Sequence, residues 1–372
     1  MPEKVVEDTI TTSITAVTVL TEEKRRRSRY ALSVLGLIGL LLIAATVGMS
    51  IGAVSVPFRD VWAIIGQHVL HLPATAGAAG GTDAIIWEIR VPRVMLGALV
   101  GAGLAVLGVA VQAMVRNPLA DPYILGVESG AAAGAVAVIF FGGALGKGIV
   151  SPALGAFAGA VITLILIFSL ARQGGRISSL RLLLVGVSLS FALSGITTFM
   201  QYATHDLAAQ QAILFWLIGG LGGAEWPQIP LMAFALAVGV TVIWYYARQL
   251  NALAVGDESA TSLGMNPDQL RTRLFVILSL VVAAAVSMVG PIGFIGLVVP
   301  HVARLLVGAE HRRVIPVALL LGATYLVSVD VLGRWLMAPS EIPVGVLTAI
   351  LGTPFFIWLI RRRDAMAIRD AR

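Results

Sequence analysis

Charged side chains stand inside apolar stretches of this sequence at spacings that bring them together on helices. Asp330 and Arg334 are four residues apart, so they share one face of an α-helix and can form an ion pair. His301 and Arg304 are three apart, and they form either a polar relay or a packed histidine beside an arginine that extends to the membrane surface. A charge within a membrane segment is commonly functional. A structural pair fits Asp330 and Arg334 equally well, because they lie near a predicted helix end.

Carboxylates deep in a helix bundle are what a proton-coupled carrier needs, and this sequence places its candidates elsewhere. Glu128 and Glu341 fall at the start of predicted helices, and Asp330 lies near the end of one. In that position Glu128 either compensates the helix dipole or faces a water-filled pathway. The terminal placement of these three carboxylates argues against proton coupling.

Metal and nucleotide chemistry have only weak signals in this sequence. The chain has no cysteine, which excludes thiolate metal sites and disulfides within it. His68 and His71 are three apart without a third ligand, a pattern more typical of surface residues than of a metal site. Residues 141–148 contain glycines and a lysine, but lack the spacing and the Ser or Thr of a phosphate-binding loop. We therefore predict no metal, no cofactor and no catalytic residue.

A polar stripe runs along one apolar segment. Ser190, Ser194, Thr197 and Gln201 recur at steps of four, three and four residues, which puts them on one face of an α-helix. Side chains of this kind line a solvated passage or hydrogen-bond to a neighbouring helix. We assign them to a transport pathway and keep helix packing as the alternative.

The composition of the chain indicates that the charged and polar side chains described above are carried by helices that cross a membrane. Hydrophobic residues make up 58% of the 372 residues and charged residues 12%, with a mean hydropathy of +0.92, so surplus apolar surface must face lipid. We predict an all-α polytopic membrane protein with about ten transmembrane helices, short cytoplasmic coupling helices and an outer half-helix. The spans are placed at about residues 30–51, 94–115, 125–141, 151–171, 182–202, 227–247, 274–288, 297–307, 314–332 and 343–360.

Three further segments lie outside this regular pattern. Residues 56–70 predict an amphipathic helix, and residues 74–81 a flexible outer loop rich in Gly and Ala. Residues 207–221 are too short to cross and predict the half-helix. The glycines and proline of 290–296 break the helical pattern at membrane depth, which is tolerated only inside protein or along water.

Residues 249–273 are polar, stand between two apolar runs, and carry the signals of two short helices. Asp257 is a candidate N-cap of the first helix, and Gly264 can end it in the left-handed conformation. Asn266 caps the second helix, with Pro267 at its first position. Helices this short are marginal alone in water, so they form against a partner. We interpret the segment as the docking site of a separate subunit that supplies energy to the protein. An ordered loop that only connects two spans is the alternative.

The lysines and arginines near the span ends indicate the topology. On the side assigned as cytoplasmic lie Lys24, Arg25, Arg26, Arg27, Arg29, Arg116, Arg172, Arg176, Arg181, Arg248, Arg271, Arg273, Arg312, Arg313 and Arg361 to Arg363; on the other lie Arg59, Arg90, Arg93, Lys147 and Arg334. This asymmetry predicts that both termini are cytoplasmic. Residues 1–29 would form a disordered tail, residues 30–361 a ten-span membrane domain that contains the segment 249–273, and residues 362–372 a second tail.

Several motifs together resemble one family of membrane proteins, the FecCD-type permeases of bacterial ABC importers. In order, they are Arg90-Val-Pro-Arg93, Gln112, Asn117-Pro-Leu-Ala120, Pro122, Leu125-Gly126, Leu253, Gly256-Asp257, Ala260, Leu263-Gly264, Gly290-Pro-Ile-Gly-Phe-Ile-Gly-Leu297, Pro300-His301, Arg304, His311-Arg312, Asp330, Arg334, Glu341-Ile-Pro-Val-Gly345 and Gly352-Thr-Pro-Phe355. The resemblance covers about residues 30–361.

This resemblance implies a role for each part of the chain. Two ATPase subunits would dock on the cytoplasmic helices at 257–270, and a second permease subunit, identical or a close paralogue, would share a substrate path at the dimer axis. The ATPase-coupling residues would be Asp257, Glu258, Ala260, Leu263 and Gly264. An extracytoplasmic substrate-binding protein would dock on Arg90, Arg93 and Arg334, for which anchoring at the membrane interface is the alternative. The loop with Ser178 and Ser179 resembles the cytoplasmic gate of this family, and these two serines join Ser190, Ser194, Thr197 and Gln201 as predicted pathway or gate residues.

The predicted function is that of a transmembrane permease subunit in a bacterial cytoplasmic membrane. By family resemblance its cargo is an iron–siderophore, with haem and cobalamin as the other cargoes of such permeases. ATP would be hydrolysed by the partner subunits and not by this chain, whose other partner is membrane lipid and not nucleic acid. The alternative is an ion- or proton-coupled secondary carrier that acts alone, to which the broken helix at 290–296 is also suited.

Overall fold

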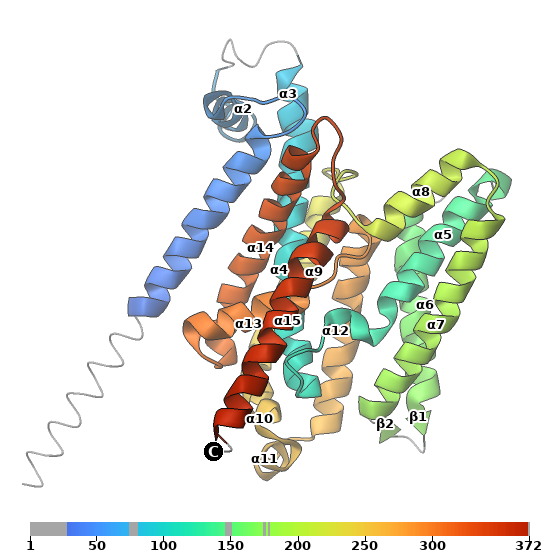
Figure 1. The fold of residues 1–372 in the computed structure, drawn as a ribbon, viewed down its shortest axis with the longest axis vertical. Coiled ribbons are helices and arrows are strands. Elements are labelled where there is room, and N and C mark those ends of the chain that lie inside the picture. Colours follow the sequence, from blue (N-terminus) through green and yellow to red (C-terminus); the bar gives the residue numbers. More distant parts are fainter. Residues whose placement is uncertain (1–27, 74–80, 146–150, 174–175, 178, 371–372) are drawn as a thin grey trace, which may run out of the picture.

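A computed structural model describes residues 28–73, 81–145, 151–173, 176–177 and 179–370 as a bundle of helices with one small hairpin (Figure 1). The elements are the first helix Ser28–Ser50, α2 Phe58–Leu70, α3 Thr82–Ala84, the π-helix η2 Ile85–Arg90, α4 Val91–Val115, the 3-10 helix η3 Pro122–Leu125, α5 Val127–Leu145, α6 Pro152–Ala171, β1 Arg172–Gln173, β2 Arg176–Ile177, α7 Ser179–Ala203, α8 Leu207–Ile218, α9 Gln228–Tyr245, α10 Ala247–Val255, α11 Asp257–Ser262, α12 Pro267–Val289, α13 Ile295–Val307, α14 His311–Leu336 and α15 Val344–Asp370.

The fold class predicted from the sequence, an all-α polytopic membrane protein, is confirmed. Among the described residues, seven helices are long and apolar enough to cross a membrane, and they coincide with seven of the ten expected spans. The third, eighth and tenth expected spans correspond to shorter apolar helical segments, Val127–Gly142 within α5, Ile295–Val307 (α13) and Val344–Trp358 within α15, so the count of ten is approximate. The fourth shorter helix is α8, with 12 residues, at the position of the expected half-helix.

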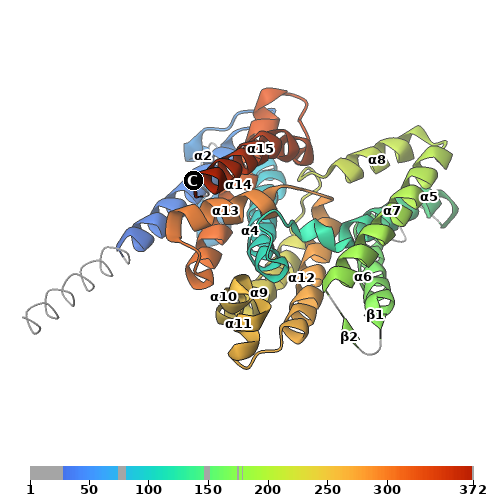
Figure 2. The ribbon, with the colours of Figure 1, turned by 60° about the horizontal axis from the view of Figure 1, so that its bottom comes forward.

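Helix α4 is the centre of the bundle, and α9, α12, α13 and α14 pack around it (Figures 1 and 2). It is buried on nearly all sides, which explains why its sequence shows apolar and small residues without a polar face. Close approach of backbones requires the small residues: a Cβ on Gly108 would overlap the carbonyl oxygen of Gly296 in α13. Similarly, a Cβ on Gly134 of α5 would overlap the carbonyl oxygen of Gly155 in α6.

The interruption after α12 lies inside the protein, as its sequence predicts. Gly290 has a φ of 68°, and α13 begins only after Phe294. The freed backbone groups find partners: Gly220 N donates to Val289 O (2.8 Å), and Ile292 N donates to the hydroxyl of Tyr123 (3.0 Å). These bonds join three segments: the residues after α8, the connection between α12 and α13, and η3. The polar groups of the irregular backbone therefore have hydrogen-bond partners inside the protein, away from lipid.

Two details of the predicted segment 249–273 are wrong. The second short helix is not separate, because the helix that starts at Pro267 continues as the membrane span α12 to Val289. Asp257 is not an N-cap, since Gly256 occupies that position and Asp257 is the first residue of α11. The side chain of Asn266 does cap α12 by accepting from Gln269 N (3.1 Å), and Gly264 has the predicted positive φ of 76°.

The structure describes only parts of the predicted tails and of the predicted outer loop. Residues 1–27 and 74–80 lie outside the described residues, so the disorder predicted for them stays a prediction. Ser28 and Arg29 already belong to the first helix, and helix α15 continues through the predicted second tail as far as Asp370. The expected amphipathic helix is present as α2.

Gly108→Ala is expected to destabilise the protein. Because its methyl group would overlap Gly296 O, α4 and α13 would have to separate, at a cost of about 1–3 kcal/mol. Thermal unfolding of the purified protein, followed by scanning fluorimetry, measures this as a lower Tm. Gly39→Ala in the first helix is the matched control, since nothing lies within 4 Å of a Cβ there. Equal melting temperatures for the two variants would contradict the close contact.

Candidate functional site

A cluster of arginines and carboxylates joins three segments at one end of the bundle. Arg93, in the first turn of α4, donates from Nε and Nη2 to Asp330 Oδ1 of α14 (3.0 and 2.7 Å). Its Nη2 also contacts Glu341 Oε2, in the connection to α15, at 2.6 Å. Arg334 Nη2 lies 3.0 Å from Asp330 Oδ2, which confirms the ion pair predicted from their spacing. Asp330 is thus a buried carboxylate between two guanidinium groups.

The remaining guanidinium contacts in this cluster hold the end of the first helix. Arg90 Nη1 donates to Met49 O (2.8 Å) and Ser50 O (2.7 Å), and Arg334 Nη1 donates to Gly48 O (2.9 Å) and Ile51 O (2.6 Å). The last carbonyls of a helix have no partner within it and carry partial negative charge. Two arginines therefore cap the first helix and fix it to α4 and α14.

The three arginines that the family resemblance assigns to binding-protein docking are brought together by this arrangement. Arg90 is 5% exposed and Arg334 7%, and both are bonded internally. Arg93 has 11% of its side chain exposed, beside Glu341 with 41%. Their positions provide a structural role that needs no external partner. The docking role stays a prediction.

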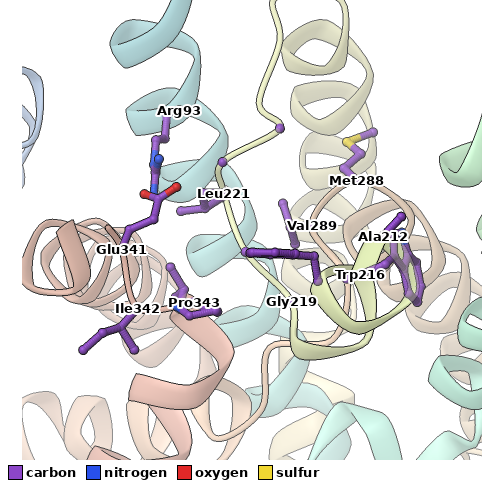
Figure 3. Close-up of a pocket in the computed structure, with 16 residues that line it drawn as sticks. Arg93, Ala212, Trp216, Gly219, Leu221, Met288, Val289, Glu341, Ile342 and Pro343 are labelled. Atoms are coloured by element: carbon purple, nitrogen blue, oxygen red, sulfur yellow. The ribbon is translucent and has the colours of Figure 1, made fainter. Parts of the chain in front are cut away.

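Two cavities open beside the cluster and share Arg93 and Glu341 as lining residues. One, of about 310 Å³, is formed by the end of α8, the end of α12 and the start of α15, with Trp216 on its wall. Figure 3 shows Glu341 pointing at Arg93 on one side of this cavity, with Gly219 and Trp216 on the other. The second cavity, of about 300 Å³, is lined by all three arginines. The Arg93–Glu341 pair therefore stands where the two cavities adjoin.

The opposite end of α4 carries a second charged contact. Arg271, in α12, donates from Nη2 to Asp257 Oδ1 (2.6 Å) and from Nη1 to Asp257 Oδ2 (3.1 Å), a bidentate pair. Its Nε donates to Met114 O in the last turn of α4 (2.9 Å), and Arg116 lies 3.6 Å from Asp257. The hydrogen bonds from the Arg271 guanidinium hold the pKa of the Asp257 carboxyl below its usual range. One arginine thus ties α11 to both α12 and α4.

The other predicted coupling residues have the exposure expected of a small docking helix. Ala260 is buried against the bundle, whereas Leu263 is 71% exposed and Glu258 is exposed. Gly264 ends this helical turn with positive φ. Leu263 stands at the C-terminal end of α11, where its exposed side chain is accessible to a partner protein. Its partner, and the coupling role, remain predictions.

The predicted pathway residues lie on α7, a helix with little of its surface buried. Thr197 is buried, Ser190 and Gln201 are half-buried, and Ser194 is exposed. The hydroxyls of Ser190 and Thr197 donate to Gly186 O (2.8 Å) and Leu193 O (2.9 Å) of their own helix. A passage along this stripe stays a prediction. Of the predicted gate residues, Ser178 lies outside the described residues and Ser179 is the first residue of α7.

Several polar residues outside these clusters have structural partners. His68 contacts Asp83 (3.0 Å) and stacks on Trp87, and within the described ranges no group of three or more His, Asp or Glu side chains could hold a metal. Gln112 of α4 donates to Gly296 O (3.1 Å) and accepts from Arg304. The last contact shows that Arg304 reaches α4 and does not simply extend to the membrane surface, while a relay with His301 stays a prediction.

Three partners in these sites were missed by the reasoning from sequence: Glu341 for Arg93, Arg271 for Asp257, and Gln112 for Arg304. Each pair joins residues that are 14 or more positions apart. A signal was present in each case, because an arginine in or beside an apolar span needs an acceptor. The pattern alone does not say which acceptor supplies it.

Comparison with known proteins agrees with this architecture. Residues 40–362 match the model of the FecCD transport family. The cobalamin import permease of Halobacterium salinarum is 40% identical over 296 residues (80% of this chain, 78% of that protein), the haemin transport permease of Yersinia pestis 40% over 331 (87% and 93%), and the iron(3+)-hydroxamate import permease of Bacillus subtilis 38% over 326 (87% and 81%). A solved structure described as an inward-facing metal-chelate type ABC transporter superposes with a TM-score of 0.73 at 32% identity, covering 89% of this chain and 99% of that one.

The fold and the sequence matches define a multi-pass membrane permease of the ABC-transporter type. The chain belongs to the FecCD transport family. Members of this family are permeases and not themselves enzymes, in agreement with the class predicted from the sequence.

Asp330→Asn is expected to destabilise the protein by about 3–5 kcal/mol, because it leaves two arginines without their buried counter-charge. Adding Arg93→Gln to Asp330→Asn should restore part of this loss, since one unpaired charge is then removed. Thermal unfolding of both variants measures the coupling. Glu310→Gln, which breaks an exposed pair with Arg313, is the control and should change stability by less than about 1 kcal/mol. A loss as small for Asp330→Asn would refute the buried pairing.

Asp257→Asn is expected to lower the Tm at neutral pH and to have no effect in acid. Because the pKa of Asp257 is lowered in the folded state, its contribution is complete above the ordinary aspartate pKa of about 3.9 and is lost as the pH falls through the lower folded value. The difference in Tm between wild type and variant should hold from pH 7 to about 5 and shrink below about 4. Asp268→Asn, 3.9 Å from Arg271, serves as the control and should differ little from wild type. A difference that already fades between pH 7 and 5 would contradict the pairing.

Proposed function

We propose that this chain is the membrane subunit of an importer that carries an iron–siderophore across the cytoplasmic membrane of a bacterium, powered by two separate ATPase subunits. The match of residues 40–362 to the FecCD transport family carries this proposal. The similar permeases act on cobalamin, haemin and iron(3+)-hydroxamate, which are all large metal–organic chelates. We favour a ferric chelate among these, with haemin and cobalamin as the other cargo classes.

The contacts of α11 support the docking of an ATPase at residues 257–270. This short helix is held to the bundle through Asp257 and Arg271, and it exposes Leu263. A force on α11 reaches α12 through the bidentate pair and α4 through Met114 O. The segment therefore has both an unpartnered apolar tip and a direct connection to the central helix.

The arginine cavity at the other end supports docking of an extracytoplasmic binding protein. Arg90, Arg93 and Arg334 line it together, and the side chain of Arg93, which contacts Asp330 and Glu341, is 11% exposed. A carboxylate from a docking protein would find positive charge there and would compete with Glu341 for Arg93. Docking of this kind explains why a charged cavity exists where lipid and water meet.

We also propose that two permease subunits pair and that both chain ends are cytoplasmic. On α7, the side chains of Phe191, Phe199 and Tyr202 are more than two-thirds exposed. The same helix carries the polar stripe of Ser190, Ser194, Thr197 and Gln201, which would line a substrate path shared by the two subunits. In the bundle, α11, the hairpin and the end of α15 gather at one end, which is where the basic residues assigned to the cytoplasm are concentrated (Figure 1).

Uptake into vesicles tests the proposal. The protein, co-purified with its ATPase and reconstituted with the binding protein outside, should accumulate a ferric hydroxamate, haemin or cobalamin only when ATP is supplied to the ATPase side. Leu263→Glu should abolish most of this uptake, because it places a charge on the exposed apolar tip that the ATPase would cover.

Val69→Glu, which changes an exposed apolar residue at the other end of the bundle, is the control and should leave ATPase binding intact. Accumulation that needs only a proton gradient, with no ATPase present, would overturn the proposal in favour of a secondary carrier. Normal ATP-dependent uptake by Leu263→Glu would remove only the docking role of α11.

A further inference from the structure

A small basic cavity lies between the first helix and the connection from α13 to α14. It has a volume of about 150 Å³ and is lined by Arg29 and Tyr30 of the first helix, by Gly308, and by Arg313 of α14. Arg29 is exposed and 29% of the Arg313 side chain is accessible. Two guanidinium groups and a phenol thus converge on one cavity from segments more than 280 positions apart in the sequence.

The charge of this cavity is positive even after its acidic neighbour is counted. Glu310 Oε2 contacts Arg313 Nε at 3.0 Å, and it is the acidic group that faces Arg313. Arg29 adds a second positive charge, whereas the dipoles of the helix ends offset one another, because the cavity lies at both the start of α14 and the end of α13. The cavity therefore suits a ligand that carries a negative charge and several hydrogen-bond acceptors.

Its position in the fold places the cavity at a boundary between lipid and water. Arg29 and Tyr30 begin the membrane-spanning first helix, while Gly308 and Arg313 mark the end of α13 and the start of the span α14. Arginine and tyrosine at span ends are typical of the headgroup layer. This placement depends on the membrane helices alone and not on the function proposed above.

Apolar surface continues from the cavity into the membrane. Leu32 and Leu35 follow on the first helix with 66% and 65% exposure, and Leu305 and Leu306 at the end of α13 are 59% and 50% exposed. In Figure 1 the first helix leans away from the bundle toward this end. A ligand with an anionic head and hydrocarbon chains would match both the cavity and the surface beside it.

We propose that this cavity binds the phosphate of an anionic phospholipid, such as phosphatidylglycerol, with its acyl chains along the first helix and α13. Basic pockets between membrane helices at a headgroup layer are suited to such lipids. The two arginines contact the phosphate oxygens, and the Tyr30 hydroxyl completes the headgroup contact. The bound lipid fills the opening between the first helix and the bundle at the end opposite to the one held by Arg90 and Arg334.

Native mass spectrometry of the purified full-length protein tests this site. Phosphatidylglycerol should be retained roughly 25-fold more tightly than phosphatidylcholine, since each of the two arginines contributes on the order of a fivefold preference for an anionic headgroup. Arg29→Gln with Arg313→Gln should reduce this preference to about twofold or less. Arg312→Gln, on the neighbouring exposed residue that does not line the cavity, is the matched control and should keep it.

Three outcomes would overturn the proposal. Equal retention of the two lipids by the wild-type protein would do so whether or not the double variant folds. An equal loss in Arg312→Gln would show a diffuse basic surface in place of a site. Displacement of the lipid by millimolar inorganic phosphate would show that the cavity takes a free anion and not a lipid headgroup.

Discussion

A carboxylate inside an apolar bundle is the constraint on which much of this structure depends. Asp330 has 2% of its side chain exposed, and the desolvation of such a group costs several kcal/mol unless it is paired and hydrogen-bonded. Arg93 and Arg334 supply that pairing from two helices. Each guanidinium has five N–H donors, and Asp330 can accept only some of them. The remaining donors of Arg93 and Arg334 therefore need acceptors in the surrounding segments.

Those further partners explain the arrangement of the bundle at this end. Arg334 reaches the last carbonyls of the first helix, which cannot be bonded within that helix, and Arg90 joins it there. Arg93 reaches Glu341, which holds the connection from α14 to α15 beside α4. The arginine side chains thus bond to helix carbonyls that have no partner within their own helix. They add to the apolar cluster of Ala44, Met49, Val91, Val94 and Val327 that also joins the first helix, α4 and α14.

Local features could be predicted from the sequence, and pairings between distant residues could not. The Asp330–Arg334 pair, the Asn266 cap and the break after Gly290 each depend on residues a few positions apart. Asp330, the partner of Arg93, lies 237 positions further along the sequence. The order of residues alone does not say which of the distant carboxylates accepts from Arg93. The length of α12 was misjudged, because an N-cap signals where a helix begins and not how far it continues.

Helix α4 connects the two charged sites. Arg93 stands in its first turn and Met114 O in its last, separated by about 30 Å at 1.5 Å per residue. Because α4 is close-packed along its length, a displacement at one end would be transmitted along the helix toward the other. At the far end the contacts differ in strength: Arg93–Asp330 is buried, while Glu341 is 41% exposed, and exposed pairs contribute only about 0–1 kcal/mol. The Arg93–Glu341 contact is therefore the one that breaks at least cost when α4 moves, and it is the contact that stands between the two cavities.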